Sequence, residues 1–115
     1  MTRKRYRVRL EATAEASIEE ERAWWEDRDP TRGDAIADEL EKAIRFLARF
    51  AGAGALVQVR DRFAETARFL VLDRINCLLF YDIVEETREV VILLLWHEGR
   101  KPPKLKVRMQ RRPKR

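Results

Sequence analysis

The strongest constraint on the fold is a stretch of three apolar runs, joined by two short polar turns, at residues 66–103. Two of these runs, Cys77–Val84 and Val90–Trp96, are apolar at almost every position. Strands of that composition must be covered on both faces, as the central strands of a sheet are. The charged break at residues 85–89 has a length that suits a hairpin between antiparallel neighbours. The stretch therefore predicts an antiparallel β-meander with its later strands at the centre of the sheet.

The residues before the meander begin with a strand and a helix. In residues 6–10 apolar residues alternate with Arg7 and Arg9, which is the pattern of a half-buried strand with the arginines outward. Thr13 is a suitable N-cap for a helix that continues to about Arg28, before the break at residues 29–30. Near the end of this helix the adjacent Trp24 and Trp25 point about 100° apart, so one of them is expected at the edge of the core.

A second helix is predicted by an apolar stripe at helical spacing. The stripe consists of Ile36, Leu40, Ala43, Ile44, Leu47 and Phe50. Glu41 and Arg45 stand four residues apart with the acid first, the favourable order for an ion pair on a helix. The short connection at residues 29–33 predicts an antiparallel hairpin of the two helices, packed on one face of the sheet. Residues 56–59 then form either a short strand or an irregular crossing.

Charge is concentrated at the two ends of the chain. Residues 1–10 carry five basic and no acidic side chains, residues 98–115 carry nine basic and one acidic, and the rest carry 11 basic and 19 acidic. Basic ends around an acidic centre suit contact with a polyanion, although basic blocks also occur as ordinary solubilising tails. Residues 104–109 alternate basic with apolar residues, which fits either an edge strand or a disordered segment. We therefore expect a single domain at 1–103 and a basic tail at 104–115.

Composition excludes several classes of protein. The longest apolar run, Val90–Trp96, is far shorter than the roughly 20 residues that span a bilayer. No apolar stretch follows the basic N-terminus, so we expect no signal peptide and a cytoplasmic protein. One cysteine, Cys77, and one histidine, His97, offer neither a disulfide nor a set of metal ligands. We therefore expect no metal and no cofactor.

Four polar residues lie along or just after the strands of the meander: Arg68, Tyr81, His97 and Arg100. A strand with an Arg, a strand ending near a Tyr, and an apolar strand closing on His and then Arg resemble the C-terminal half of the RelE/ParE superfamily. These are the toxins of type II toxin–antitoxin systems, and they include ParE-like plasmid stabilisation proteins. The resemblance covers roughly residues 6–103 and implies an α+β fold: an N-terminal strand, an antiparallel two-helix hairpin and an antiparallel meander, with the helices on one sheet face.

One branch of this superfamily implies a ribosome-dependent messenger-RNA endoribonuclease. If the four residues gather at one rim of the sheet, the arginines would stabilise charge on phosphorus while His97 or Tyr81 moves protons. The 2′-OH of RNA is the nucleophile, so no metal is needed. The chain departs from that branch at Leu78, where an Arg usually precedes the Tyr, and at residues 101–104, which replace a basic-then-Tyr ending. Whether the chain is an enzyme therefore stays open.

The ParE branch implies a toxin that inhibits DNA gyrase by binding, and the departures just named favour it. His97 would then only end a strand and donate a hydrogen bond. The basic residues after the last strand would contact the target: Arg100, Lys101, Lys104, Lys106 and Arg108.

Either branch implies a cognate antitoxin that neutralises the toxin in a hetero-oligomer. An antitoxin helix would lie along the helical hairpin, or an antitoxin strand would extend an open sheet edge. We expect contacts at Trp24, Trp25, Asp38 and Glu41, and the acidic helix faces predict an antitoxin segment rich in Lys or Arg. The alternative from a different class is a non-catalytic basic module that binds nucleic acid through phosphate contacts.

Overall fold

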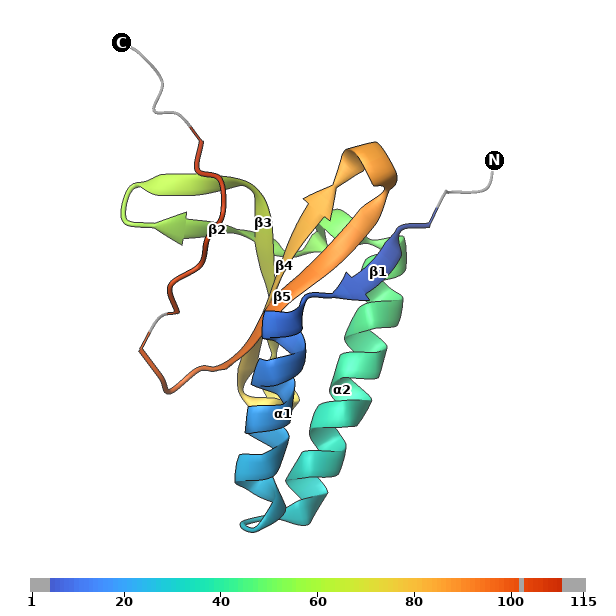
Figure 1. Ribbon diagram of the computed structural model, residues 1–115, viewed down its shortest axis with the longest axis vertical. Coiled ribbons are helices and arrows are strands. Elements are labelled where there is room, and N and C mark those ends of the chain that lie inside the picture. The colour runs from blue at the N-terminus through green and yellow to red at the C-terminus, as the bar shows by residue number, and fades with distance from the viewer. Residues whose placement is uncertain (1–4, 102, 111–115) are drawn as a thin grey trace.

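The described residues form one five-stranded sheet in the order β1-β5-β4-β3-β2, with two helices against one of its faces (Figure 1). The computed structural model describes residues 5–101 and 103–110. The elements are β1 Arg7–Leu10, α1 Ala12–Glu26, α2 Pro30–Arg49, β2 Ala55–Val59, β3 Arg62–Leu72, β4 Cys77–Val84 and β5 Glu89–His97. Single turns of 3-10 helix, η1 to η3, lie at Ala51–Ala53, Asp73–Ile75 and Glu85–Thr87.

The meander occupies the centre of the sheet, as its apolar runs predict. β4 pairs antiparallel with both β3 and β5, and β5 also pairs in parallel with β1. The predicted α+β fold is thus confirmed, and the parallel β1 makes the sheet mixed. Residues 56–59 belong to a true strand, β2, at the edge opposite β1.

Each face of the sheet has its own apolar core, because successive side chains of a strand point to opposite faces. Leu79 and Tyr81 of β4 face the helices and are fully buried there. Four residues of α2 pack on this face: Ile36, Leu40, Ala43 and Leu47. Phe80 belongs to the second core, on the opposite face, with Val57, Ala64 and Ala67.

The start of α1 differs from the prediction. Its N-cap position is Glu11, and Thr13 lies inside the first turn. The Thr13 hydroxyl donates to the carbonyl of Leu93 at 2.9 Å, so it ties the helix to β5 instead of capping the helix. At the other end the helix stops at Glu26, and Pro30 begins α2 at the position where a proline is best tolerated. Trp24 is 44% exposed whereas Trp25 packs on the core, as their angular separation predicts.

Residues 103–110 cross the sheet face opposite the helices, and we call this segment the strap. The side chains of Leu105, Val107 and Met109 pack into the second core, while Lys104, Lys106 and Arg108 are exposed. Regular strand pairing was one of two expectations for this segment, but its only bridge within the described residues joins Met109 to Ala64. The alternation of apolar and basic residues therefore serves to cover a sheet face rather than to extend the sheet.

No helix within residues 5–101 and 103–110 is long and apolar enough to cross a membrane.

Candidate functional site

Arg68 and Tyr81 lie opposite each other on β3 and β4, and both bind the loop around η1. The Tyr81 hydroxyl donates to the Ala51 carbonyl at 2.7 Å and accepts from the Gly54 N–H at 2.9 Å. An Arg68 guanidinium nitrogen donates to the Gly54 carbonyl at 2.7 Å. The two side chains thus hold the connection between α2 and β2 against the sheet.

Tyr81 is therefore a core tyrosine whose hydroxyl is occupied by two hydrogen bonds to the backbone. Its side chain is fully buried, and burial raises its pKa, an effect that the Gly54 hydrogen bond and the Arg68 charge partly oppose. A phenol with its donor and its acceptor both engaged inside the protein is poorly placed to move protons for a substrate. Arg68 also has a structural partner, the Gly54 carbonyl of the same loop.

His97 and Arg100 lie at the other end of β4, so the four residues do not gather at one rim. His97 pairs across the sheet with Cys77, whereas Tyr81 pairs with Ile92 and Arg68. Tyr81 lies four positions along β4 from Cys77, which corresponds to about 13 Å. The ring nitrogen Nδ1 of His97 accepts the Gly99 N–H at 3.2 Å, so this histidine shapes the turn after β5 as an acceptor rather than the expected donor.

Arg100 lies close to a buried acid, Glu21, that was not predicted from the sequence. Glu21 of α1 is only 4% exposed, and its carboxylate lies 3.6 Å from an Arg100 guanidinium nitrogen. It also accepts the indole N–H of Trp25 at 3.0 Å. A signal was available in the sequence: Glu21 continues the helical stripe of Ala14, Ile18 and Trp25 at i, i+4, i+7 and i+11.

The thiol of Cys77 lies in the same cluster, 4.0 Å from the Glu21 carboxylate. Burial raises the pKa of this thiol from 9.0 to about 12, and the Glu21 charge adds to the effect. The thiolate is the reactive form, so Cys77 is unsuited to be a nucleophile. The cluster therefore joins α1 to the turn after β5 and has no evident reacting group.

The predicted target-binding cations fall into two groups. Lys104, Lys106 and Arg108 form the exposed row of the strap, while Arg100 and Lys101 follow β5 on the way to it. The strap is fixed at its far end, where Glu65 N–H donates to Arg108 and Gln110 N–H donates to Phe63. The fold thus presents a short cationic row on the sheet side away from the helices.

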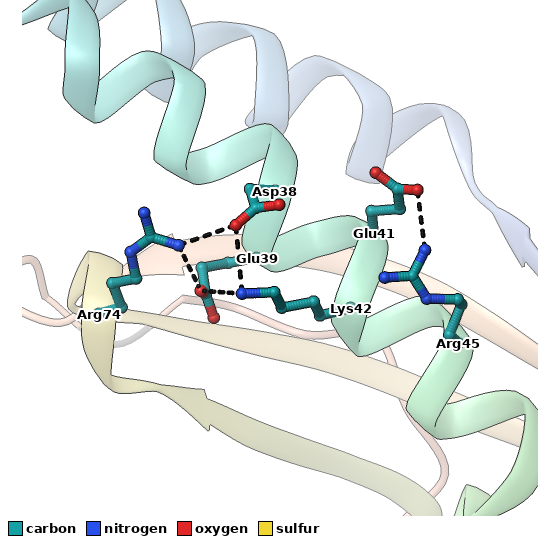
Figure 2. Close-up of polar contacts among 6 residues, drawn as sticks. All are labelled: Asp38, Glu39, Glu41, Lys42, Arg45 and Arg74. Carbon is teal, nitrogen blue, oxygen red and sulfur yellow. Dashed lines mark hydrogen bonds and ion pairs between the residues drawn. The ribbon is translucent and has the colours of Figure 1, made fainter.

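The residues predicted to contact an antitoxin lie on the helical hairpin, but the acidic ones already have cationic neighbours (Figure 2). Asp38 lies 2.8 Å from Arg74 of η2 and 3.2 Å from Lys42, and Glu41 lies 2.9 Å from Arg45. Hydrogen bonds from Arg74 and Lys42 lower the pKa of Asp38. The outer face of α2 is therefore charge-balanced, which weakens the expectation that it selects a segment rich in Lys or Arg.

No group of three or more His, Cys, Asp or Glu side chains that could hold a metal occurs in the part of the chain that the structure describes. Arg68 and Tyr81 bind the loop around η1, and His97 binds the turn after β5. Fold and site together define a small α+β protein in which two helices pack on a five-stranded sheet.

Comparison with models of known families identifies the family of this chain. Residues 8–102 match the model of the ParE toxin of the type II toxin–antitoxin system parDE, so the chain belongs to the ParE toxin family. It is thus a toxin of the RelE/ParE superfamily, as the resemblance indicated. No curated protein matches the chain significantly.

Solved structures share its fold at low sequence identity. The chromosomal ParDE toxin–antitoxin system from P. aeruginosa superposes with a TM-score of 0.65 at 14% identity, covering 83% of this chain and 98% of that one. The toxin–antitoxin complex RelBE2 from Mycobacterium tuberculosis gives a TM-score of 0.54 at 23% identity, covering 84% of this chain and 94% of that one.

Proposed function

We propose that this chain is a growth-inhibiting toxin that acts in the cytoplasm by binding DNA gyrase and is neutralised by a cognate antitoxin. Gyrase inhibition is the activity that the sequence resemblance implies for the ParE branch. In this proposal the strap cations, with Arg100 and Lys101, form the target-binding surface. Neither a metal nor a cofactor takes part.

One observation favours gyrase over messenger RNA as the target: the hydroxyl of Tyr81 is occupied by structural hydrogen bonds. Its hydroxyl is buried and bonded at both ends, to Ala51 and Gly54. Arg68 binds the same loop, and His97 lies about 13 Å away along the strand. A phosphodiester cannot contact groups that are so divided, and general acid–base catalysis requires hydrogen-bond reach.

The test is controlled induction in a bacterial host, with incorporation of labelled thymidine, uridine and leucine followed over the first minutes. Gyrase inhibition predicts that thymidine incorporation falls first, and the purified protein should then block supercoiling by gyrase. An early fall in leucine incorporation would overturn the proposal in favour of messenger-RNA cleavage. If none of the three falls, the chain is an inactive toxin or a binding module.

A charge-reversal variant tests whether the strap cations form the target-binding surface. The double variant Lys104→Glu, Lys106→Glu removes exposed cations of the strap while keeping its apolar residues. We expect it to lose growth arrest and supercoiling inhibition. The control, Arg7→Glu with Arg22→Glu, changes the net charge equally at exposed sites on β1 and α1 and should stay toxic. Equal loss in both variants would attribute the effect to net charge rather than to the strap.

A further inference from the structure

Two contiguous grooves follow the C-terminal end of α2 and share Arg49 and Phe50. The first has a volume of about 540 Å³, and we call it the α2 groove. Its lining consists of Arg5, Val8, Ile44, Arg45, Phe46, Ala48, Arg49 and Phe50. The second groove, of about 570 Å³, continues past η1.

Two phenylalanines stand exposed in the α2 groove. Phe46 and Phe50 are 43% and 45% exposed. Phe46 lies in the last turn of α2, whose other face fills the core, and Phe50 is the C-cap residue of that helix. Their rings contact each other with centroids 5.3 Å apart, one helical turn from each other. Exposed apolar side chains that lie together in a concavity mark a binding surface more often than scattered ones do.

Among the described residues, the charged side chains that line this groove are all arginines. Arg5, Arg45 and Arg49 line the groove together with the two rings, whereas the neighbouring groove is lined by Arg68, Arg88 and the acid Glu85. Arg45 lies 2.9 Å from Glu41, yet its side chain is 67% exposed, so it can reach a second carboxylate. The groove thus offers an apolar floor and a cationic rim.

We propose that the α2 groove docks an acidic segment of the cognate antitoxin. Two apolar side chains of that segment lie on Phe46 and Phe50, about one helical turn apart, and its carboxylates face Arg5, Arg45 and Arg49. Planar guanidinium groups bind carboxylates in pairs of hydrogen bonds, which fixes the register of the segment. The antitoxin as occupant rests on the proposed function, whereas the chemistry of the segment rests on the groove alone.

A single-stranded nucleic acid suits the groove less well. Bases bind to aromatic rings by stacking on an open face. The two rings are tilted by 42° and lean on each other, so they do not form a platform. The other apolar lining residues, Val8, Ile44 and Ala48, are aliphatic and suit apolar side chains.

The proposal also reverses the charge expected of the antitoxin. The acids that suggested a basic segment, Asp38 and Glu41, are balanced by cations of this chain (Figure 2). At the far end of the same helix, the described lining of the α2 groove holds Arg5, Arg45 and Arg49 and no acid, although Arg45 also pairs with Glu41. An acidic segment is therefore the complementary partner for the α2 groove.

The test uses a fluorescein-labelled synthetic peptide, a glutamate-rich helix former with two leucines four positions apart, titrated with the full chain by fluorescence anisotropy. We expect Phe50→Ser and Arg49→Glu each to weaken its binding at least about thirtyfold, the scale of an interface hot spot. Matched controls are Val71→Ser, an exposed apolar residue of β3, and Arg22→Glu on α1. Both should bind like the wild type, as should any variant that leaves the groove intact.

Three results would overturn the proposal: no saturable binding of the peptide, equal binding of its lysine-for-glutamate version, or tighter, Phe50-dependent binding of oligodeoxythymidine. The same variants are also induced in cells. Because the groove serves the neutralising partner, Phe50→Ser and Arg49→Glu should still arrest growth, and loss of arrest in both would also count against the proposal. If the wild-type chain binds the peptide through the groove but does not arrest growth, the proposed function is refuted. The proposed chemistry of the α2 groove would then still hold.

Discussion

At the scale of single residues, Tyr81 is the clearest case of a conspicuous side chain with a structural role. Tyr81→Phe removes a hydroxyl that satisfies both the Ala51 carbonyl and the Gly54 N–H inside the protein. Leaving buried polar groups without partners costs about 1–3 kcal/mol. We expect that loss in the free energy of unfolding by urea, with growth arrest retained at permissive temperature.

Tyr6→Phe is the control for this substitution, because the Tyr6 hydroxyl binds the exposed Glu85 carboxylate at 2.6 Å. Its stability should change much less than that of Tyr81→Phe. If Tyr81→Phe folds normally and no longer arrests growth, Tyr81 acts on the target and its structural assignment is wrong.

The loop that Tyr81 holds also makes a glycine necessary. A Cβ on Gly54 would lie 2.6 Å from both the Phe69 carbonyl oxygen and the Tyr81 hydroxyl oxygen. Gly54→Ala must therefore shift β3 or break the Tyr81 contact, and overpacking of this kind costs about 1–3 kcal/mol. Gly33→Ala, inside α2 with nothing within 4 Å, should instead stabilise by about 0.5–1 kcal/mol. Urea unfolding of the two variants, Gly54→Ala and Gly33→Ala, tests whether the first lowers and the second raises the free energy of unfolding.

The buried Cys77 thiol predicts a dependence of stability on pH. Its folded-state pKa of about 12 lies above the usual 9.0, so the folded state keeps this proton longer than the unfolded state does. Its contribution to stability is complete below about pH 9 and is lost as the pH rises toward 12. Urea midpoints measured from pH 8 upward should therefore fall less steeply for Cys77→Ala than for the wild type. Parallel slopes would show that the thiol ionises equally well in the folded state.

At the scale of elements, the strap combines two roles on alternate residues. Leu105 and Val107 cover the second core, whereas Lys104 and Lys106 are exposed. We expect Leu105→Ser with Val107→Ser to lower stability by about 1–2 kcal/mol, since both side chains are only partly buried, and to increase binding of a hydrophobic dye. Lys104→Ser with Lys106→Ser should leave both unchanged. Equal dye binding by the two variants would mean that the strap does not cover the face.

The elements also show where sequence patterns were sufficient. The stripe of α2 and the apolar runs of β4 and β5 predicted a helix and two central strands, because burial on a known face leaves a periodic trace. The strap has the same alternation of apolar and polar residues as an edge strand. Such alternation indicates which side chains are buried, but not whether the backbone pairs with a neighbouring strand. The start of α1 was misplaced because Thr13 satisfies a β5 carbonyl, a contact between residues 80 positions apart.

At the scale of the whole molecule, the candidate site was predictable in its residues but not in its geometry. Arg68 and Tyr81 are near each other because β3 and β4 are neighbours in register. His97 is distant because β5 runs antiparallel to β4 and ends where β4 begins. Antiparallel strand order alone could give the second relation, whereas the first depends on register, which a one-residue slip changes. The surroundings of Glu21 could not be predicted from the sequence, because its neighbours Cys77 and Arg100 come from β4 and the turn after β5.

The distribution of charge over the molecule leads to a last prediction, which separates the toxin from a general nucleic-acid binder. The described strap offers three exposed cations in a row, Lys104, Lys106 and Arg108. Three phosphate contacts give a log–log slope of binding against salt of about −2.7, which leaves little affinity for duplex DNA at physiological salt. We expect this weak, salt-sensitive binding in a fluorescence titration, with the slope reduced by about 1.8 in the double variant Lys104→Glu, Lys106→Glu. Tight binding with a much steeper slope would mean that many more cations contact the duplex at once, and the chain would then act as a nucleic-acid-binding module in addition to, or instead of, a toxin.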